Sequence, residues 1–179
     1  EDISEVYFPW LDSQSGRSSL TNRRGAVDWD GQNKLISDLK VFRDLGFKLD
    51  LLLNGNCYGK HAMSQYLQNN IYSILDYLED KVGGVDIVTT ASPAIAHMIK
   101  QRYPNMEVRA SVNMRIGTVK GIQYVSHLFD SFYIQREYNR DFERIEELHE
   151  WAKANKKEML MLANSGCMNF CSGQTFHDN

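Results

Sequence analysis

The hydrophobic positions of this chain of 179 residues follow two patterns that alternate along its length. Short apolar runs predict strands at 5–10, 49–53, 85–91, 108–114, 131–135 and 159–163. We interpret the leucine-rich run 49–53 as continuously apolar, which is typical of a strand buried on both faces. Between the runs, apolar residues recur every three or four positions, the spacing of a buried helical stripe. The last such stripe includes Phe142, which we expect to point inward.

Residues that favour helix ends occur where the helical stripes begin and stop. Ser92 precedes a proline, and Thr118 and Asp141 precede two further stripes, so each can cap the first turn of a helix. Gly46 and Gly83 follow the last apolar residues of the first two stripes, as glycine does at helix C-termini. The sequence therefore predicts six strands that alternate with five helices.

This alternation predicts an α/β fold with a parallel sheet. A doubly wound sheet usually has a glycine-rich phosphate loop, and neither GxGxxG nor GxxxxGK[ST] is present, so no nucleotide cofactor is indicated. Polar residues follow most of the predicted strands, as they do at the active face of a (β/α)8 barrel. We therefore favour a TIM-barrel-like fold. Because six strands are two short of eight, we expect 1–179 to be a single barrel domain that lacks flanking strands.

Composition indicates an ordinary globular domain, with 42% hydrophobic and 24% charged residues. No apolar run reaches the roughly 20 residues that span a bilayer, and no signal segment opens the chain, so we expect a soluble, cytoplasmic protein without a membrane partner. The net charge is −3 and the basic residues are scattered, which gives no clear signal for nucleic-acid binding. The odd count of three cysteines argues against a disulfide framework and favours reduced thiols or metal ligands.

Four polar residues in the loops after strands are candidates for substrate binding. Asn54 and Asn56 follow the second predicted strand, and Asn164 follows the sixth. Arg17 lies beside a glycine in the loop after the first strand, where a guanidinium could hold a carboxylate or phosphate. Loops after parallel strands converge on one rim of a barrel, so these residues could share a site. Alternatively, Arg17 is an ordinary solvated side chain.

The fourth and fifth predicted strands end in the candidate catalytic residues. Asn113 ends the fourth strand, and Gln135, Arg136 and Glu137 end the fifth. Glu137 could act as a general acid or base, and Arg136 could hold an anion. Strand alternation predicts Gln135 and Glu137 on one face and Arg136 on the other. The alternative is a salt bridge that ties the strand to the next helix.

The cysteines are the candidate metal ligands. Cys167 and Cys171 lie on the loop after the last predicted strand, and Cys57 lies in a matching place after the second. Thiolates favour zinc or iron–sulfur clusters, which commonly take four protein ligands. The fourth ligand could be His177, His61 or a cysteine outside this sequence. Alternatively, the three cysteines are small buried hydrophobic residues.

Several of these segments resemble one known family, the collagenase-like peptidases, which form peptidase family 32 of unknown catalytic type. The resemblance is carried by 135–141 with the helix after it, by 162–171, and by Phe176-His177-Asp178. The loop 15–17 and the segment 54–57 are similar too. The family's further spaced cysteines are not present in this sequence.

The resemblance implies a TIM-barrel-like catalytic domain and a hydrolase that acts on peptides. Some relatives instead support oxygen-independent hydroxylation of RNA bases or of a quinone precursor, with cysteines that hold a four-iron four-sulfur cluster. By position, Cys167 and Cys171 are similar to two of those cysteines. We therefore expect a peptidase with its site on the barrel rim. The alternatives are an iron–sulfur hydroxylation factor and a non-catalytic, metal-stapled binding module.

Overall fold

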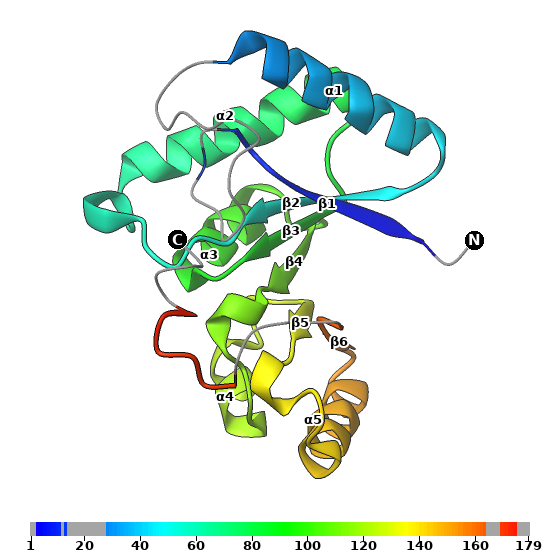
Figure 1. The fold of residues 1–179 in the computed structure, drawn as a ribbon. Coiled ribbons are helices and arrows are strands. Elements are labelled where there is room, and N and C mark those ends of the chain that lie inside the picture. Colours follow the sequence, from blue (N-terminus) through cyan, green and yellow to red (C-terminus); the bar gives the residue numbers. More distant parts are fainter. Residues whose placement is uncertain (1–2, 12, 14–27, 164–168, 175–179) are drawn as a thin grey trace.

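The computed structural model describes residues 3–11, 13, 28–163 and 169–174 (Figure 1). The strands are β1 (Glu5–Pro9), β2 (Lys48–Leu53), β3 (Ile87–Thr90), β4 (Glu107–Ala110), β5 (Ser131–Tyr133) and β6 (Glu158–Leu160). The α-helices are α1 (Trp29–Asp44), α2 (Gln65–Val82), α3 (Pro93–Arg102), α4 (Val119–Val125) and α5 (Phe142–Ala154). Three short 3-10 turns are η1 (Gly59–His61), η2 (Val112–Met114) and η3 (Arg136–Tyr138).

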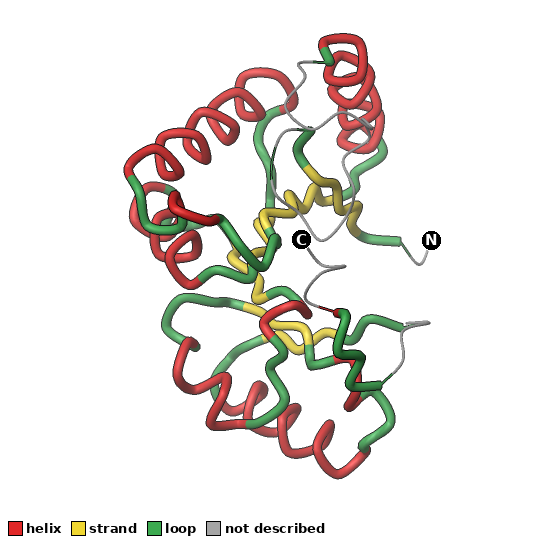
Figure 2. The backbone as a smooth tube through the Cα atoms, turned by 60° about the vertical axis from the view of Figure 1, so that its left-hand side comes forward, coloured by secondary structure: helices red, strands yellow, loops and turns green. Residues whose placement is uncertain are grey.

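The six strands form one sheet in which each strand pairs in parallel with the next along the chain. This uninterrupted order β1-β2-β3-β4-β5-β6 is that of a barrel wall, whereas a doubly wound sheet reverses its order at a switch point. Figure 2 shows that the strands follow a curve with the helices around its outside. Within the described residues β1 and β6 do not pair, so the sheet is an open part of a TIM-like barrel. The predicted fold class is confirmed.

The predicted helix caps are present. The side chains of Ser92, Thr118 and Asp141 each accept a hydrogen bond from a backbone N–H three residues further on, at the starts of α3, α4 and α5. Gly83 ends α2 in the left-handed conformation, with φ of 73°. Each cap satisfies backbone groups that the helix leaves unpaired, so local sequence sets the limits of these helices.

Five of the six strands are shorter than predicted, and for β4 and β5 the cause is a turn that follows directly. β4 ends at Ala110 and β5 at Tyr133, and the residues after each enter the 3-10 turns η2 and η3. In η2 the Ser111 side chain accepts a hydrogen bond from the Asn113 backbone N–H, which favours a turn over continued strand pairing. Phe142, expected to point inward, is 78% exposed because it begins α5 on the solvent side.

The outer face of the sheet forms the hydrophobic core with the helices. Phe8, Leu51, Val88, Val108 and Phe132, one from each of five strands, are all at most 5% exposed. Burial of such side chains contributes roughly 1.5–3 kcal/mol each.

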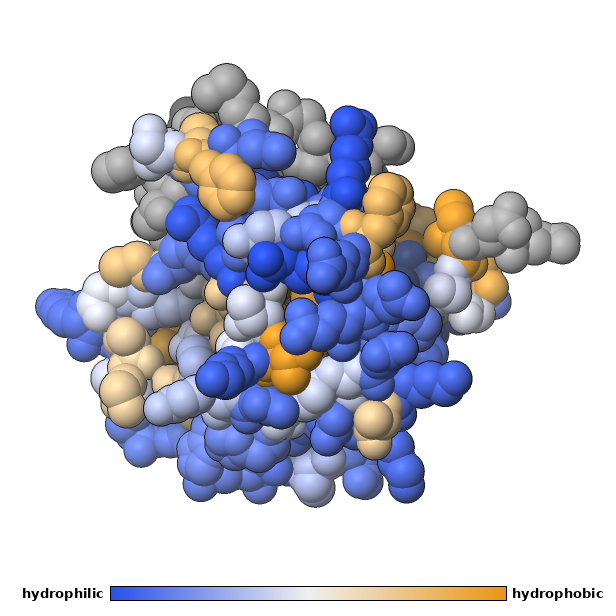
Figure 3. Space-filling view, turned by 90° about the horizontal axis from the view of Figure 1, so that it is seen from below, coloured by the Kyte–Doolittle hydropathy of each residue, from blue (hydrophilic) through white to orange (hydrophobic). Residues whose placement is uncertain are grey.

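On the face seen in Figure 3, hydrophilic residues predominate and hydrophobic ones form small separate groups, as is normal for a folded surface.

The inner, concave face is polar at its amino-terminal end, around Arg109 of β4. Arg109 is 2% exposed, and its Nη1 lies 2.5 Å from Glu5 Oε1 of β1. Its Nη2 lies 2.9 Å from Glu107 Oε1, and its Nε donates to Ser131 Oγ of β5 at 3.0 Å. One guanidinium therefore bridges strands that are not neighbours in the sheet.

Asp50 of β2 belongs to the same buried cluster, so the run 49–53 is not continuously apolar. Its Oδ2 accepts a hydrogen bond from Thr89 Oγ1 at 2.8 Å and lies 3.8 Å from Arg109 Nη1. Its Oδ1 has no hydrogen-bond partner among the described residues. Burial raises the pKa of Asp50 to about 6, although Thr89 and Arg109 act to lower it. Burial disfavours the ionised carboxylate. Arg109 is shared between Asp50, Glu5 and Glu107, so its charge offsets only part of this effect on the pKa of Asp50.

We predict that Arg109→Met destabilises the fold by about 3–5 kcal/mol, because it leaves buried carboxylates without their counter-charge. Urea unfolding followed by circular dichroism measures the change. The control is Lys34→Met, which removes an exposed ion pair with Asp38 on α1 and should change stability by less than about 1 kcal/mol. Equal effects of the two substitutions would contradict a structural role for the buried cluster.

We predict that Asp50→Asn changes how stability depends on pH. An ordinary aspartate loses its proton near pH 4, whereas folded Asp50 keeps it to about pH 6, so the wild-type protein loses stability as pH rises between these values. Asparagine does not titrate and can still accept the Thr89 hydrogen bond. The stability of the variant relative to wild type should therefore rise by about 2 kcal/mol between pH 4 and pH 7. Unfolding at both pH values tests this, and a pH-independent difference would refute it.

Candidate functional site

The loops after β2, β4 and β5 meet at the carboxyl-terminal rim of the sheet. Asn113 in η2 is the link between them: its Nδ2 donates to the backbone carbonyl of Asn54 at 3.0 Å. Its Oδ1 accepts from Arg136 Nη2 of η3 at 3.1 Å. Asn54 is 8% exposed, and Asn113 and Arg136 are half-buried. Three of the predicted site residues are therefore joined in one hydrogen-bonded chain.

Gln174 extends this chain to the segment after β6. It is 6% exposed, and in the amide orientation that satisfies its neighbours its oxygen accepts from Arg136 Nη2 at 3.2 Å. Its nitrogen then donates to Glu137 Oε1, also at 3.2 Å. Sequence reasoning missed Gln174, because nothing about one glutamine past the last strand signals a contact with η3. We call Asn54, Asn113, Arg136, Glu137 and Gln174 the rim network.

Two buried oxygens at the rim, one in the rim network and one beside it on Asn139, have no hydrogen-bond partner within the described residues. Glu137 Oε2 is buried and has no hydrogen-bond partner within the described part of the chain. The same holds for Oδ1 of Asn139, whose Nδ2 donates to the carbonyl of Leu162 after β6 at 2.8 Å. Buried polar atoms in native proteins normally have a partner, and exceptions often mark places that water or a ligand fills. A water molecule or a substrate amide N–H would suit both oxygens.

Gln135 lies apart from the rim network. Because β5 ends at Tyr133 and residues Arg136–Tyr138 turn, the expected alternation of faces does not hold. Arg136 and Glu137, predicted on opposite faces, both contact Gln174. Gln135 instead lines a pocket beside α4.

The structure says less about the other three predicted substrate-binding residues. Asn56 is half-buried in the loop after β2. Arg17 and Asn164 lie outside the described residues. Their roles stay predictions.

The predicted metal ligands do not form a complete site within the described residues. Cys57 is exposed after β2, and its Sγ accepts a hydrogen bond from the Gly59 backbone N–H at 3.4 Å. Cys171 is half-buried, and Cys167 and His177 lie outside the described residues. Where side chains are described, no three His, Cys, Asp or Glu residues are grouped so as to hold a metal. The described residues alone do not fit a zinc ion or an iron–sulfur cluster.

We predict that Asn113→Ala lowers the free energy of unfolding by about 1–3 kcal/mol, because it leaves the Asn54 carbonyl and the Arg136 guanidinium each short of a partner. The matched control is Asn105→Ala, in the exposed turn between α3 and β4, which should change stability by less than about 0.5 kcal/mol. Urea unfolding of both variants measures the difference. An unchanged Asn113→Ala protein would show that the rim network adds no stability.

No helix in the described part of the chain is long and apolar enough to cross a membrane. No protein-family pattern and no curated protein matches the sequence. The fold is similar to a solved structure described as that of the U32 peptidase Mk0906, with a TM-score of 0.77 and 19% sequence identity. The similarity covers 98% of this chain and 66% of that chain. This chain thus has the fold of part of that protein.

Proposed function

We propose that this chain is related to the collagenase-like peptidases and hydrolyses peptide bonds at the carboxyl-terminal rim of its barrel. Two independent features support the family relation: the sequence resemblance around residues 135–141 and 162–171, and the similarity of fold to a U32 peptidase. The location of the proposed active site is supported by the rim network, in which a carboxylate and a guanidinium lie among amides at the carboxyl ends of the strands. Strand ends are where barrel enzymes place their catalytic groups.

The amides of the rim network suit a peptide substrate. Asn113 and Gln174 each present a donor and an acceptor, and a peptide group offers the complementary pair. An extended peptide could exchange its own N–H and C=O groups for contacts that the two side chains now make within the network. We therefore assign Asn113 and Gln174 to substrate binding.

In the proposed reaction Glu137 is the general base and Arg136 stabilises negative charge. Glu137 takes a proton from a water molecule, whose oxygen attacks the carbonyl carbon of the scissile bond. The carbonyl electron pair moves to its oxygen, which Arg136 stabilises. The tetrahedral intermediate then collapses, the carbon–nitrogen bond breaks, and Glu137 returns the proton to the amine. Water and the peptide bond are both consumed, and no other reactant is needed.

An iron–sulfur function remains an untested alternative. It rests on the resemblance and on Cys57, Cys167 and Cys171, and no described contact favours it. We derive no chemical step through a cluster. A chain without turnover on peptides but with stoichiometric iron and sulfide after anaerobic purification would support this alternative instead.

We predict that Glu137→Gln lowers kcat on a fluorogenic peptide panel by about 10²–10⁴-fold, because it removes the base while retaining the side chain's shape. Arg136→Lys should lower kcat by about 10²-fold or more. Glu150→Gln, an exposed carboxylate on α5, is the control and should leave kcat unchanged. Thermal unfolding of each variant separates lost chemistry from lost structure. Equal kcat for wild type and Glu137→Gln, or no turnover by wild type across the panel, would overturn the proposed function.

A further inference from the structure

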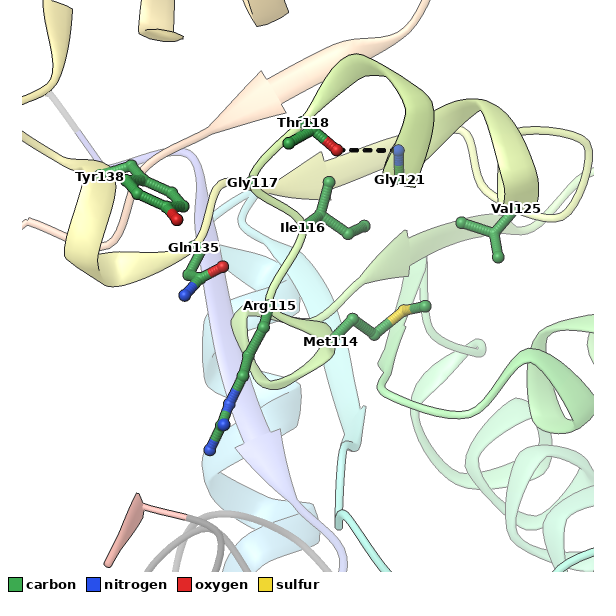
Figure 4. A pocket seen from close by; sticks show the side chains of 9 residues that line it. All are labelled: Met114, Arg115, Ile116, Gly117, Thr118, Gly121, Val125, Gln135 and Tyr138. Carbon is green, nitrogen blue, oxygen red and sulfur yellow. Dashed lines mark hydrogen bonds between the residues drawn. The ribbon is translucent and has the colours of Figure 1, made fainter. Parts of the chain in front are cut away.

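A pocket of about 220 Å³ lies beside the rim network, between η2, α4 and η3. It is lined by Met114, Arg115, Ile116, Gly117, Thr118, Gly121, Val125, Gln135 and Tyr138 (Figure 4). Pockets for whole drug-sized ligands usually begin at about 300 Å³. This pocket therefore suits one amino-acid side chain better than a large ligand.

The wall formed by Tyr138 is held in place by close contacts. A Cβ atom at Gly117 would lie 2.4 Å from Tyr138 Cε2, so only glycine allows the ring to pack so near the backbone. The Arg144 guanidinium lies 4.0 Å from the centre of the same ring and donates to the Gly117 carbonyl at 2.6 Å. The Tyr138 wall is thus built before any ligand binds.

The turn at 135–138 has two sides with different tasks. Gln135 and Tyr138 line the pocket, whereas Arg136 and Glu137, between them in the chain, belong to the rim network. A residue whose side chain enters the pocket therefore places its backbone within reach of the turn that carries the proposed base.

We propose that this pocket binds the apolar side chain of a substrate residue next to the scissile bond; this rests on the proposed function. Met114, Ile116, Val125 and the ring of Tyr138 supply apolar surface. The nine lining residues include one arginine and no acidic residue, so a lysine or arginine side chain would enter without a counter-charge. Leucine, methionine or phenylalanine side chains fit both the size and the chemistry.

The test uses N-acetyl-leucinamide as a probe, with N-acetyl-lysinamide for comparison. NMR spectra of wild-type protein with labelled methyl groups should show shifts of Met114, Ile116 and Val125 on adding the leucine probe, with a Kd of about millimolar. The lysine probe should cause no such shifts. Val125→Phe, which fills the pocket, should abolish the shifts of Met114 and Ile116, whereas Tyr124→Ala, at a position 87% exposed on the same helix, should retain them.

Failure of this proposal is distinguishable from failure of the proposed function. Leucine-probe binding at these methyls without any peptide turnover would support the pocket and refute the peptidase. Turnover that is equal for leucine- and lysine-containing peptides, and unchanged by Val125→Phe, would overturn the pocket while the peptidase stands. Should Val125→Phe fail to fold, the two probes on wild-type protein decide alone: equal shifts, or none, refute the proposal.

Discussion

The ion pair between Arg109 and Glu5 is the contact on which the shape of the sheet depends. The two residues belong to β4 and β1, three strand spacings apart, or about 14 Å in a flat sheet. Their side chains meet on the concave side only because the sheet curves. Arg109 also contacts Glu107 and Ser131, so the same guanidinium extends this connection to β5. Removing the charge of one partner from a buried ion pair lowers the free energy of unfolding strongly. The pair between Arg109 and Glu5 therefore favours the curved form of the sheet.

The curvature in turn brings the loops together at the opposite end of the strands. All six strands run in parallel, so their carboxyl ends lie along one arc, and the loops after β2, β4 and β5 point toward a common space. The early ends of β4 and β5 complete the arrangement. The turns η2 and η3 then place Asn113, Arg136 and Glu137 close together at the rim. Longer strands would have extended these residues away from one another.

The sequence predicted the features that depend on interactions between neighbouring residues. It did not predict the features that depend on contacts between residues far apart in the chain. Apolar periodicity and capping residues such as Ser92 predicted the order and type of the elements, because each depends on a few neighbouring residues. Asp50 was overlooked among leucines, since its partners Thr89 and Arg109 come from other strands. Gln174 could not be predicted, because only the fold places it against Arg136. Residues 164–168 and 175–179 lie outside the described chain, so the cysteine site stays a prediction.

Two polar clusters occupy the two ends of the sheet, and their differences support a structural role for one and the proposed catalytic role for the other. Each contains a carboxylate oxygen without a hydrogen bond from the described residues, on Asp50 and on Glu137. Asp50 is 1% exposed and lies between Thr89 and Arg109 inside the sheet, which fits a structural role. Glu137 is half-buried on a short turn at the rim, beside a pocket. A general base needs an oxygen that is free to accept a proton and a place near the substrate. Glu137 lies on a turn at the rim and Asp50 inside the sheet, so of these two carboxylates Glu137 is the one that we propose as the base.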